Sequence, residues 1–374
     1  MSHDQNPADG PGRDSRTGSR TGSTPSVAAR TGSLRAARLP RWSNLAVAAV
    51  SVLVACPVGL AGGLESKVQW GLIAALLFVF GGYALAARVE GRRQAKDRVV
   101  TSVVWVAFLA AFIPLASLVW ETVKRGVKIL DPYFLSHSMV NISSMDEGGG
   151  IYHAIIGSVE QVGLATVIAA PIGLLTAVYL VEYGRGKLAK TVTFFVDVMT
   201  GIPSIVAGLF ILSLMLLLKA EPFGFAGSLA LAILMIPVVV RSTEEMLKLV
   251  PNELREASLA LGVPKWRTIL KVVLPTSIGG ITTGVMLAIA RIAGETAPVL
   301  LLVWGSSYIN MDPFHGGQSS LPLYIYQQYA TSGGYGASYD RAWAAALTLI
   351  AFVMILNLAA RALARWKAPK TSGR

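Results

Sequence analysis

The chain has 374 residues, of which 53% are hydrophobic and only 14% are charged. Soluble domains carry nearly twice that share of charged residues, so the composition excludes an ordinary soluble protein. The formal net charge of +12 could suggest nucleic-acid binding, but the basic residues are concentrated in loops between long apolar stretches, which is typical of a membrane protein.

The first 42 residues are predicted to form a disordered basic tail. They are rich in Ser, Thr, Gly, Pro and Arg and have almost no large apolar side chains, so they cannot bury enough surface to fold. The basic side chains would be attracted to anionic lipid headgroups. A second short tail is predicted at residues 363–374.

Eight apolar stretches lie between these tails, each without charge or with one or two isolated charges. About 20 apolar residues are needed to cross the hydrocarbon core of a bilayer. Only helices satisfy every backbone polar group there without forming a closed barrel. We therefore predict an all-α polytopic membrane protein with about eight transmembrane helices. The predicted spans are 44–64, 68–87, 99–120, 155–181, 195–218, 226–240, 274–304 and 342–360.

The spans divide the chain into three predicted regions. Residues 43–90 form a hairpin of two spans. Residues 91–151 hold the third span and a long external loop. The other five spans lie in residues 152–362, which form a denser unit with a large basic loop at 241–275.

The basic loops predict the orientation of the chain. Lysine and arginine in short loops mark the cytoplasmic side of a membrane, whereas residues 305–339 contain neither. One predicted external loop, with Lys124, Arg125 and Lys128, disagrees but is outnumbered. We therefore expect both termini to be cytoplasmic. The basic segments on that side are 88–98, 185–190, 241–271 and 361–374.

Several kinds of chemistry have no matching motif in the chain. There is no phosphate-binding sequence G-x-x-x-x-G-K-[ST], so we expect ATP hydrolysis only from a partner. The four histidines are scattered without zinc-site spacing, and no G-x-S-x-G elbow is present. Cys56 is the one cysteine, which excludes an intrachain disulfide. We predict a transport subunit rather than an enzyme, with no catalytic residue, metal site or cofactor.

Residues 251–266, between the sixth and seventh spans, are predicted to form two short helices with a break. Asn252 can cap the first helix. Gly262 suits a left-handed end to that helix, and Pro264 suits the first turn of the next. The segment would be a stiff element that projects from the cytoplasmic face.

This loop resembles the conserved loop E-A-A-x3-G-x9-I-x-L-P of ABC importer permeases. The chain has Glu256, Ala257 and Ser258, then Gly262, then Val272-Val273-Leu274-Pro275, with the same spacing throughout. Ser258 replaces an alanine and Val272 an isoleucine. The resemblance implies a type I ABC importer permease fold in the C-terminal part, in which Glu256, Ala257, Ser258 and Gly262 dock on the ATPase subunit.

Two further segments resemble phosphate permeases, namely 201–210 (GIPSIVAGLF) and 291–298 (RIAGETAP). Residues 240–247 and 147–150 resemble their A-type subunit, of the CysTW-like subfamily. The similarity covers about residues 90–365, so the first two spans are additional to the six of this family.

The resemblance implies import of inorganic phosphate across the bacterial plasma membrane. It also implies a C-type permease partner, a dimer of ATP-binding subunits and an extracytoplasmic phosphate-binding protein.

Arg291 and Glu295 are the first candidates for the anion path. They lie four residues apart in the stretch 274–304, so a continuous helix would present them on one face. A charge near the bilayer centre costs at least about 2.5–3.5 kcal/mol, so such residues face a bundle interior or a water-filled path. The arginine fork suits phosphate, and the carboxylate would accept the proton of hydrogen phosphate but repel sulfate. The alternative is a structural salt bridge between them, which could also open during gating.

Arg241 and Glu244, at the cytoplasmic end of the sixth span, are second candidates for the anion path. The alternative for Arg241 is an arginine whose head reaches the membrane interface.

Three other functions stay open. One is an ABC importer of another oxyanion, such as sulfate or molybdate. Another is an ion-coupled secondary transporter, which would need inverted repeats and broken helices, and the sequence displays neither. The last is a membrane scaffold or sensor, in which Arg291 and Glu295 would tolerate neutral replacement.

Overall fold

A computed structural model describes residues 39–40, 42–63, 66–221 and 223–367. Nearly all of the predicted N-terminal tail, and residues 368–374, lie outside that description. The described residues are helical apart from loops and one isolated β-bridge between Trp304 and Gln318. The prediction of an all-α protein is confirmed. The chain divides into two compact units, residues 1–112 and 113–374.

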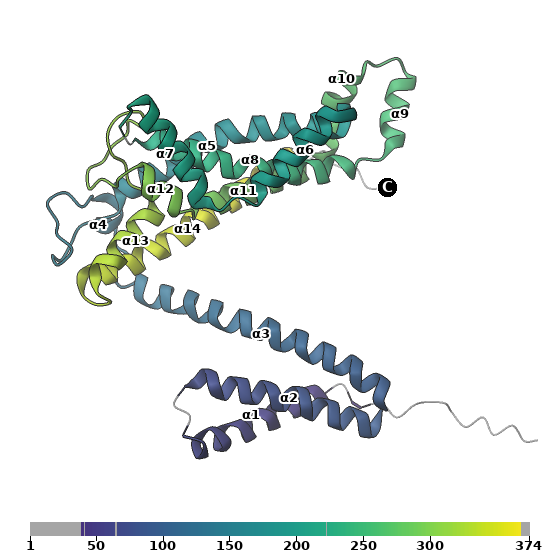
Figure 1. Cartoon of the computed structure of the whole chain (residues 1–374). Helices are drawn as coiled ribbons and strands as arrows, with labels where there is room; N and C mark the ends of the chain where they lie inside the picture. The colour runs from purple at the N-terminus through teal and green to yellow at the C-terminus, as the bar shows by residue number, and fades with distance from the viewer. Residues whose placement is uncertain (1–38, 41, 64–65, 222, 368–374) are drawn as a thin grey trace, which may run out of the picture. The chain divides into compact units, whose positions relative to one another are not determined.

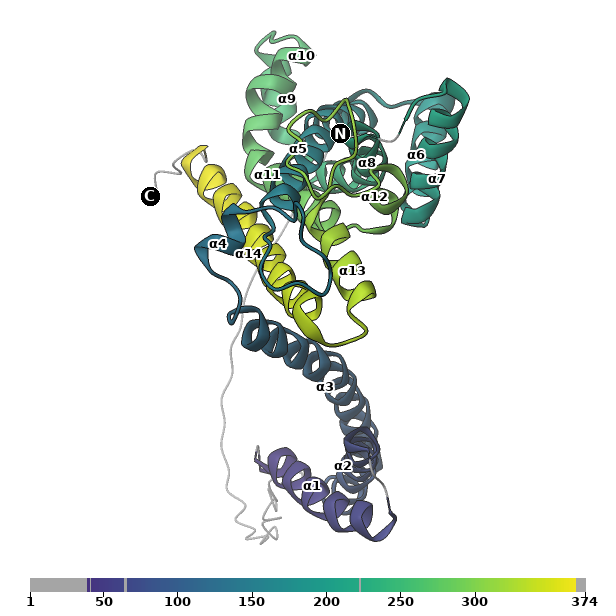
Figure 2. The same cartoon turned by 90° about the vertical axis from the view of Figure 1, so that its left-hand side faces the viewer.

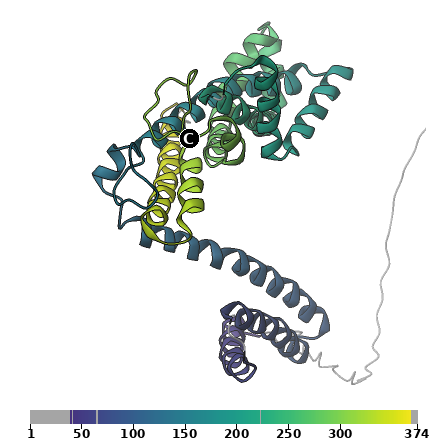
Figure 3. The ribbon, with the colours of Figure 1, turned by 60° about the vertical axis from the view of Figure 1, so that its left-hand side comes forward.

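The first unit contains the predicted hairpin. Helix α1 (Ser43–Ala61) and helix α2 (Lys67–Val89) lie side by side (Figures 1 and 3). Arg98, in the first turns of α3 (Arg92–Gly126), donates two hydrogen bonds of 2.7 and 2.8 Å to the Glu90 carboxylate. Its Nη1 also donates to Ser43 Oγ at 3.2 Å. This fork therefore ties together the start of α1, the end of α2 and the start of α3.

The core of the second unit is built on α5 (Tyr152–Val178) and α8 (Gly224–Lys248). These helices pack closely because small residues lie at their contact: a Cβ added to Gly173 would lie 2.7 Å from Val239 Cγ1. Helix α11 (Leu274–Ala293) also packs against α8 through a small residue, with Gly284 against Ser242.

The ends of the second unit differ in structure. One end contains the short helix α4 (Pro132–Ser136) and the turn between α13 (Leu321–Ser332) and α14 (Gly336–Lys367). Helices α13 and α14 lie side by side (Figures 1 and 2). At the opposite end α9 (Asn252–Ala260) and α10 (Lys265–Thr268) project from the bundle (Figure 1). Two π-helical segments adjoin this second end, Tyr179–Tyr183 after α5 and Ile269–Val273 before α11.

Two predicted spans are broken. Helices α6 (Gly186–Thr200) and α7 (Ser204–Leu218) meet at 106°, so the prediction of one continuous span at 195–218 is wrong. The expectation from the sequence that no helix is broken is wrong for the same reason. The cause is Pro203, which fixes its own φ and disfavours helical backbone at the residue before it.

The stretch 274–304 is also interrupted. Helix α11 ends at Ala293, and the short α12 (Ala297–Leu302) follows with Pro298 in its first turn. Over the residues that the structure describes, seven helices are long and apolar enough to cross a membrane, or eight if α6 and α7 cross together.

Candidate anion path and coupling surface

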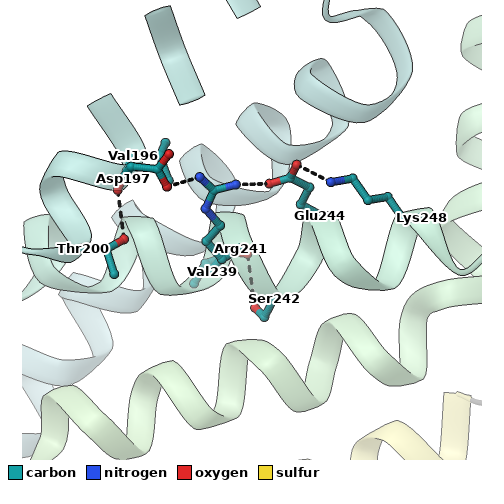
Figure 4. Close-up of polar contacts among 8 residues, drawn as sticks. All are labelled: Val196, Asp197, Thr200, Val239, Arg241, Ser242, Glu244 and Lys248. Carbon is teal, nitrogen blue, oxygen red and sulfur yellow. Dashed lines mark hydrogen bonds and ion pairs between the residues drawn. The ribbon is translucent and has the colours of Figure 1, made fainter. Parts of the chain in front are cut away.

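Arg241 lies at the centre of a row of charges that joins α6 to α8 (Figure 4). Its Nη1 donates to Glu244 Oε2 at 2.7 Å, and its Nη2 donates to Asp197 of α6. Lys248 donates to the other oxygen of Glu244 at 2.7 Å. Two basic and two acidic side chains therefore neutralise one another. The pairing with Asp197 was not predicted, because 44 residues separate the two in the chain.

Both ends of the Arg241 fork are occupied in this conformation, so an anion would have to displace a carboxylate. Asp197 is the more accessible of the two, with 59% of its side chain exposed against 12% for Glu244. Exposed ion pairs contribute little stability. Breaking the ion pair between Arg241 and Asp197 therefore costs less free energy than breaking the one between Arg241 and Glu244. Glu244 can then keep the guanidinium oriented.

Arg291 and Glu295 do not share a helix face, so that prediction is wrong. Arg291 lies in the last turn of α11, whereas Glu295 follows the helix end at Gly294. Among the described residues none forms an ion pair or side-chain hydrogen bond with either of them. The predicted salt bridge is not formed in this conformation. Arg291 is exposed, so its fork is available to a ligand or to a partner subunit.

The two helices predicted in the cytoplasmic loop are present as α9 and α10. Gly262 between them has a φ of +76°, as predicted for a left-handed helix end. Asn252 is not the cap that we predicted: Pro251 occupies the cap position, and the Asn252 side chain accepts a hydrogen bond from Arg255 at 3.1 Å.

The predicted coupling residues fall into two sets. Glu256 and Ala257 are exposed, and no described residue bonds the Glu256 side chain. Ser258 is half-buried, and its Oγ lies 2.9 Å from Thr268 Oγ1 of α10. The serine that departs from the family pattern therefore joins the two helices, which leaves Glu256 and Ala257 on a surface open to a partner.

The sequence did not reveal the residues that anchor this loop. Arg255 and Lys265 both bond Glu182, in the π-helical segment that follows α5. They lie 73 and 83 residues from it in the chain, so no local pattern could have found them.

The opposite end of the unit is organised by Arg341, which is 1% exposed. Its guanidinium donates to the backbone oxygens of the loop before α5 and to Gln328 Oε1 at 2.9 Å. Gly148 and Gly149 have φ values of +88° and +78°, which explains the glycine run in that loop. The four backbone oxygens belong to Ser143, Ser144, Asp146 and Gly148.

A cavity of about 230 Å³ opens near this loop. Its lining residues are all uncharged. His153 and Tyr324 contribute to the wall, and His153 Nδ1 and the Tyr324 hydroxyl are buried without a partner among the described residues. None of the predicted anion-path residues lines it.

Comparison with known protein families supports the resemblance seen in the sequence. Residues 169–373 match the family model described as the binding-protein-dependent transport system inner membrane component. The chain is 50% identical over 271 residues to phosphate transport system permease protein PstA 1 of Mycobacterium tuberculosis (strain CDC 1551 / Oshkosh), which covers 72% of this chain and 88% of that protein.

Two other relatives carry the PstA name. The protein of Mycobacterium leprae (strain TN) is 49% identical, over 72% of this chain and 89% of its own length. That of Pasteurella multocida (strain Pm70) is 40% identical, over 72% and 94%. A bacterial alginate ABC transporter solved with its periplasmic protein has a similar fold, with a TM-score of 0.51 at 15% identity over 72% of this chain and 95% of that one.

Proposed function

This chain belongs to the PstA family of phosphate transport permeases, and from that premise we propose that it translocates inorganic phosphate as a permease subunit of an ATP-driven importer. The observation that carries the proposal is the 50% identity to a PstA protein over nearly all of that protein's length. The exposed element α9–Gly262–α10 supports it, because a transport subunit without its own ATPase site needs a surface for the subunit that has one.

The partners follow from the family. A second permease of the C type pairs with this chain, and a dimer of ATP-binding subunits contacts α9 through Glu256, Ala257 and Ser258. Gly262 provides the turn that presents this surface. An extracytoplasmic phosphate-binding protein delivers the ligand to the opposite end of the unit.

The chain is a multi-pass protein of the bacterial inner membrane, and both termini are cytoplasmic in the proposed orientation. The basic loop with α9 and α10 then lies in the cytoplasm, and the loop 305–320, which has no lysine or arginine, lies outside. This agrees with the enrichment of basic residues on the cytoplasmic side.

The anion path uses Arg291 and Glu295 at the break after α11, and Arg241 with Glu244 nearer the cytoplasm. Arg291 has no described partner and can donate two parallel hydrogen bonds to phosphate. Glu295 accepts the proton of hydrogen phosphate, which sulfate lacks. Phosphate then displaces Asp197 from Arg241 while Glu244 keeps its bond. ATP binding shifts the population between outward-open and inward-open states, because ATP binds one of them more tightly.

The test of this function is uptake of radiolabelled phosphate in cells whose only phosphate importer contains this chain, with sulfate uptake measured in parallel. Phosphate uptake that depends on the chain, without sulfate uptake, supports the proposal. Dependence of sulfate uptake would point instead to an importer of another oxyanion. Uptake that persists when the ATP-binding subunit is inactivated would favour an ion-coupled transporter.

Replacing Arg291 with glutamine is expected to lower phosphate uptake by about 10- to 100-fold, because a hydrogen bond to a charged group contributes roughly 1.5–3 kcal/mol. The measurement is the initial rate of radiolabelled phosphate uptake at equal membrane abundance. Arg88→Gln is the control, because Arg88 is exposed in the other unit. Normal uptake by Arg291→Gln would remove Arg291 from the path and leave it a structural role.

A further inference from the structure

The π-helical segment Tyr179–Tyr183, which follows α5, is held by both helices of the coupling loop. Arg255 of α9 donates from Nε to Glu182 Oε1 at 2.9 Å. Lys265, the first residue of α10, donates from Nζ to the backbone oxygen of the same Glu182. Its ammonium also lies 4.9 Å from the centre of the Tyr183 ring, which is within range of a cation–π interaction. The two helices on either side of the Gly262 turn therefore both bond one residue, Glu182, of the π-helical segment after α5.

Arg255 connects this segment to a third helix. Its Nη2 donates to Leu247 O at 2.9 Å, in the last turn of α8, and its Nη1 donates to Val250 O at 2.7 Å. A guanidinium has five donors in a rigid planar fork, so one arginine can hold the end of α8, the start of α9 and the π-helical segment after α5 in one arrangement. A lysine in this position could keep the charge but not the geometry.

The two side chains of the pair are largely covered, although the helix that carries Arg255 is mostly exposed. The Arg255 and Glu182 side chains are 16% and 6% exposed, whereas Glu256, the next residue on α9, is exposed. Removal of one partner from a buried pair leaves the other charge uncompensated. Helix α9 thus has one surface open to a partner and an anchored side that bonds the π-helical segment after α5 and the end of α8.

The attachment lies at irregular backbone. Glu182 belongs to the π-helical segment Tyr179–Tyr183, and such segments occur frequently at functional sites. Beyond it α5 packs along α8 through Gly173 and Val239. A displacement of α9 therefore acts on the π-helical segment after α5 at Glu182, and on α8 at Leu247. Helices α5 and α8 form the centre of the core.

We propose that Glu182 and Arg255 are the positioning residues that transmit the motion of α9, driven by the ATPase, to the transmembrane core. The inference rests on the proposed function and specifies where the chain receives its conformational signal. Neither residue contacts phosphate or the ATPase in this role. Their replacement should therefore uncouple ATP hydrolysis from transport, but it should not prevent the ATPase subunit or phosphate from binding to the permease.

The test uses the complete transporter in proteoliposomes with the phosphate-binding protein, and measures both phosphate imported and ATP hydrolysed. Glu182→Gln is expected to lower phosphate imported per ATP by about tenfold, since substitution of a single residue along such a connection changes the coupling between two sites. The ATPase rate should stay within about twofold of wild type, since the docking residues of α9 are unaltered. Glu245→Gln is the matched control, because Glu245 is exposed and no described residue pairs with it.

A second comparison separates transmission from a merely structural role. Arg255→Lys keeps the charge but loses the fork, and its loss of coupling should not add to that of Glu182→Gln in the double variant. The inference would be overturned if the losses of coupling in the two single variants added up in the double variant, or if Glu182→Gln imported as much phosphate per ATP as the wild type. Neither result would affect the proposal that the chain imports phosphate. A wild-type transporter that imports no phosphate would instead overturn the proposed function.

If the transporter with Glu182→Gln does not assemble, Glu182→Asp is measured instead, because it keeps the charge and only shortens the side chain. The expected result is an assembled transporter with reduced phosphate imported per ATP. If Glu182→Asp also fails to assemble, or assembles and is fully coupled, the pair has no role in transmission and the inference is wrong.

Discussion

Replacing Glu256 with lysine is expected to abolish phosphate uptake, with a loss of at least about 100-fold, while the protein stays abundant in the membrane. Glu256 is exposed on α9, and no described residue bonds its side chain, so the substitution leaves the subunit's own contacts intact. The new positive charge would lie on the surface proposed to meet the ATPase. Unfavourable charge contacts in an interface cost several kcal/mol.

The measurement is radiolabelled phosphate uptake together with recovery of the ATP-binding subunit when the permease is purified. We expect both to be lost. Glu221→Lys is the control, since it makes the same charge reversal at an exposed residue just beyond the end of α7. If Glu256→Lys transports phosphate normally and retains the ATP-binding subunit, α9 is not the docking element.

Replacing Arg341 with methionine is expected to destabilise the second unit by about 3 kcal/mol, because a hydrogen bond to a charged group contributes roughly 1.5–3 kcal/mol. The loop residues that accept these bonds are exposed or half-buried, so water can take over part of the hydrogen bonding. The side chain is 1% exposed and donates to four backbone oxygens of the loop before α5, all within 3.2 Å. A methionine of similar length fills the space but supplies no donor. A loss of this size is at the upper end of what single substitutions cause.

The thermal unfolding midpoint of the purified protein in detergent tests this, together with its abundance in the membrane. Both should fall sharply for Arg341→Met. Arg361→Met serves as the comparison, because Arg361 lies on the same helix and is exposed. Equal midpoints for the two variants would show that the loop does not depend on Arg341.

Local patterns explain the parts of this protein that could be predicted. Long apolar stretches indicated the helices, because a bilayer requires about 20 apolar residues in helical form. The two short helices around Gly262 were predicted because a left-handed residue at the end of a helix is a local backbone requirement. The resemblance at Glu256–Pro275 and the family relationship also depend on the order of residues alone.

Hydropathy failed where backbone conformation overrides composition. The residues around Pro203 and Gly294 are apolar enough to read as continuous spans, yet the chain bends by 106° at the first and ends a helix at the second. A window average registers the transfer energy of side chains but not the φ restriction of proline. As a result Arg291 and Glu295, which a continuous helix would have aligned, belong to different segments.

The sequence by itself thus determined the all-α membrane class, the two short helices on either side of Gly262 and the family. Only the tertiary structure decided which charges meet: Arg241 with Asp197, Arg255 with Glu182, and Arg341 with the loop before α5. In the chain, Asp197 lies 44 residues from Arg241, Glu182 lies 73 residues from Arg255, and Asp146 lies 195 residues from Arg341. A charge finds its partner in space, so the packing of the helices and loops selects that partner, and separation along the chain does not reveal it.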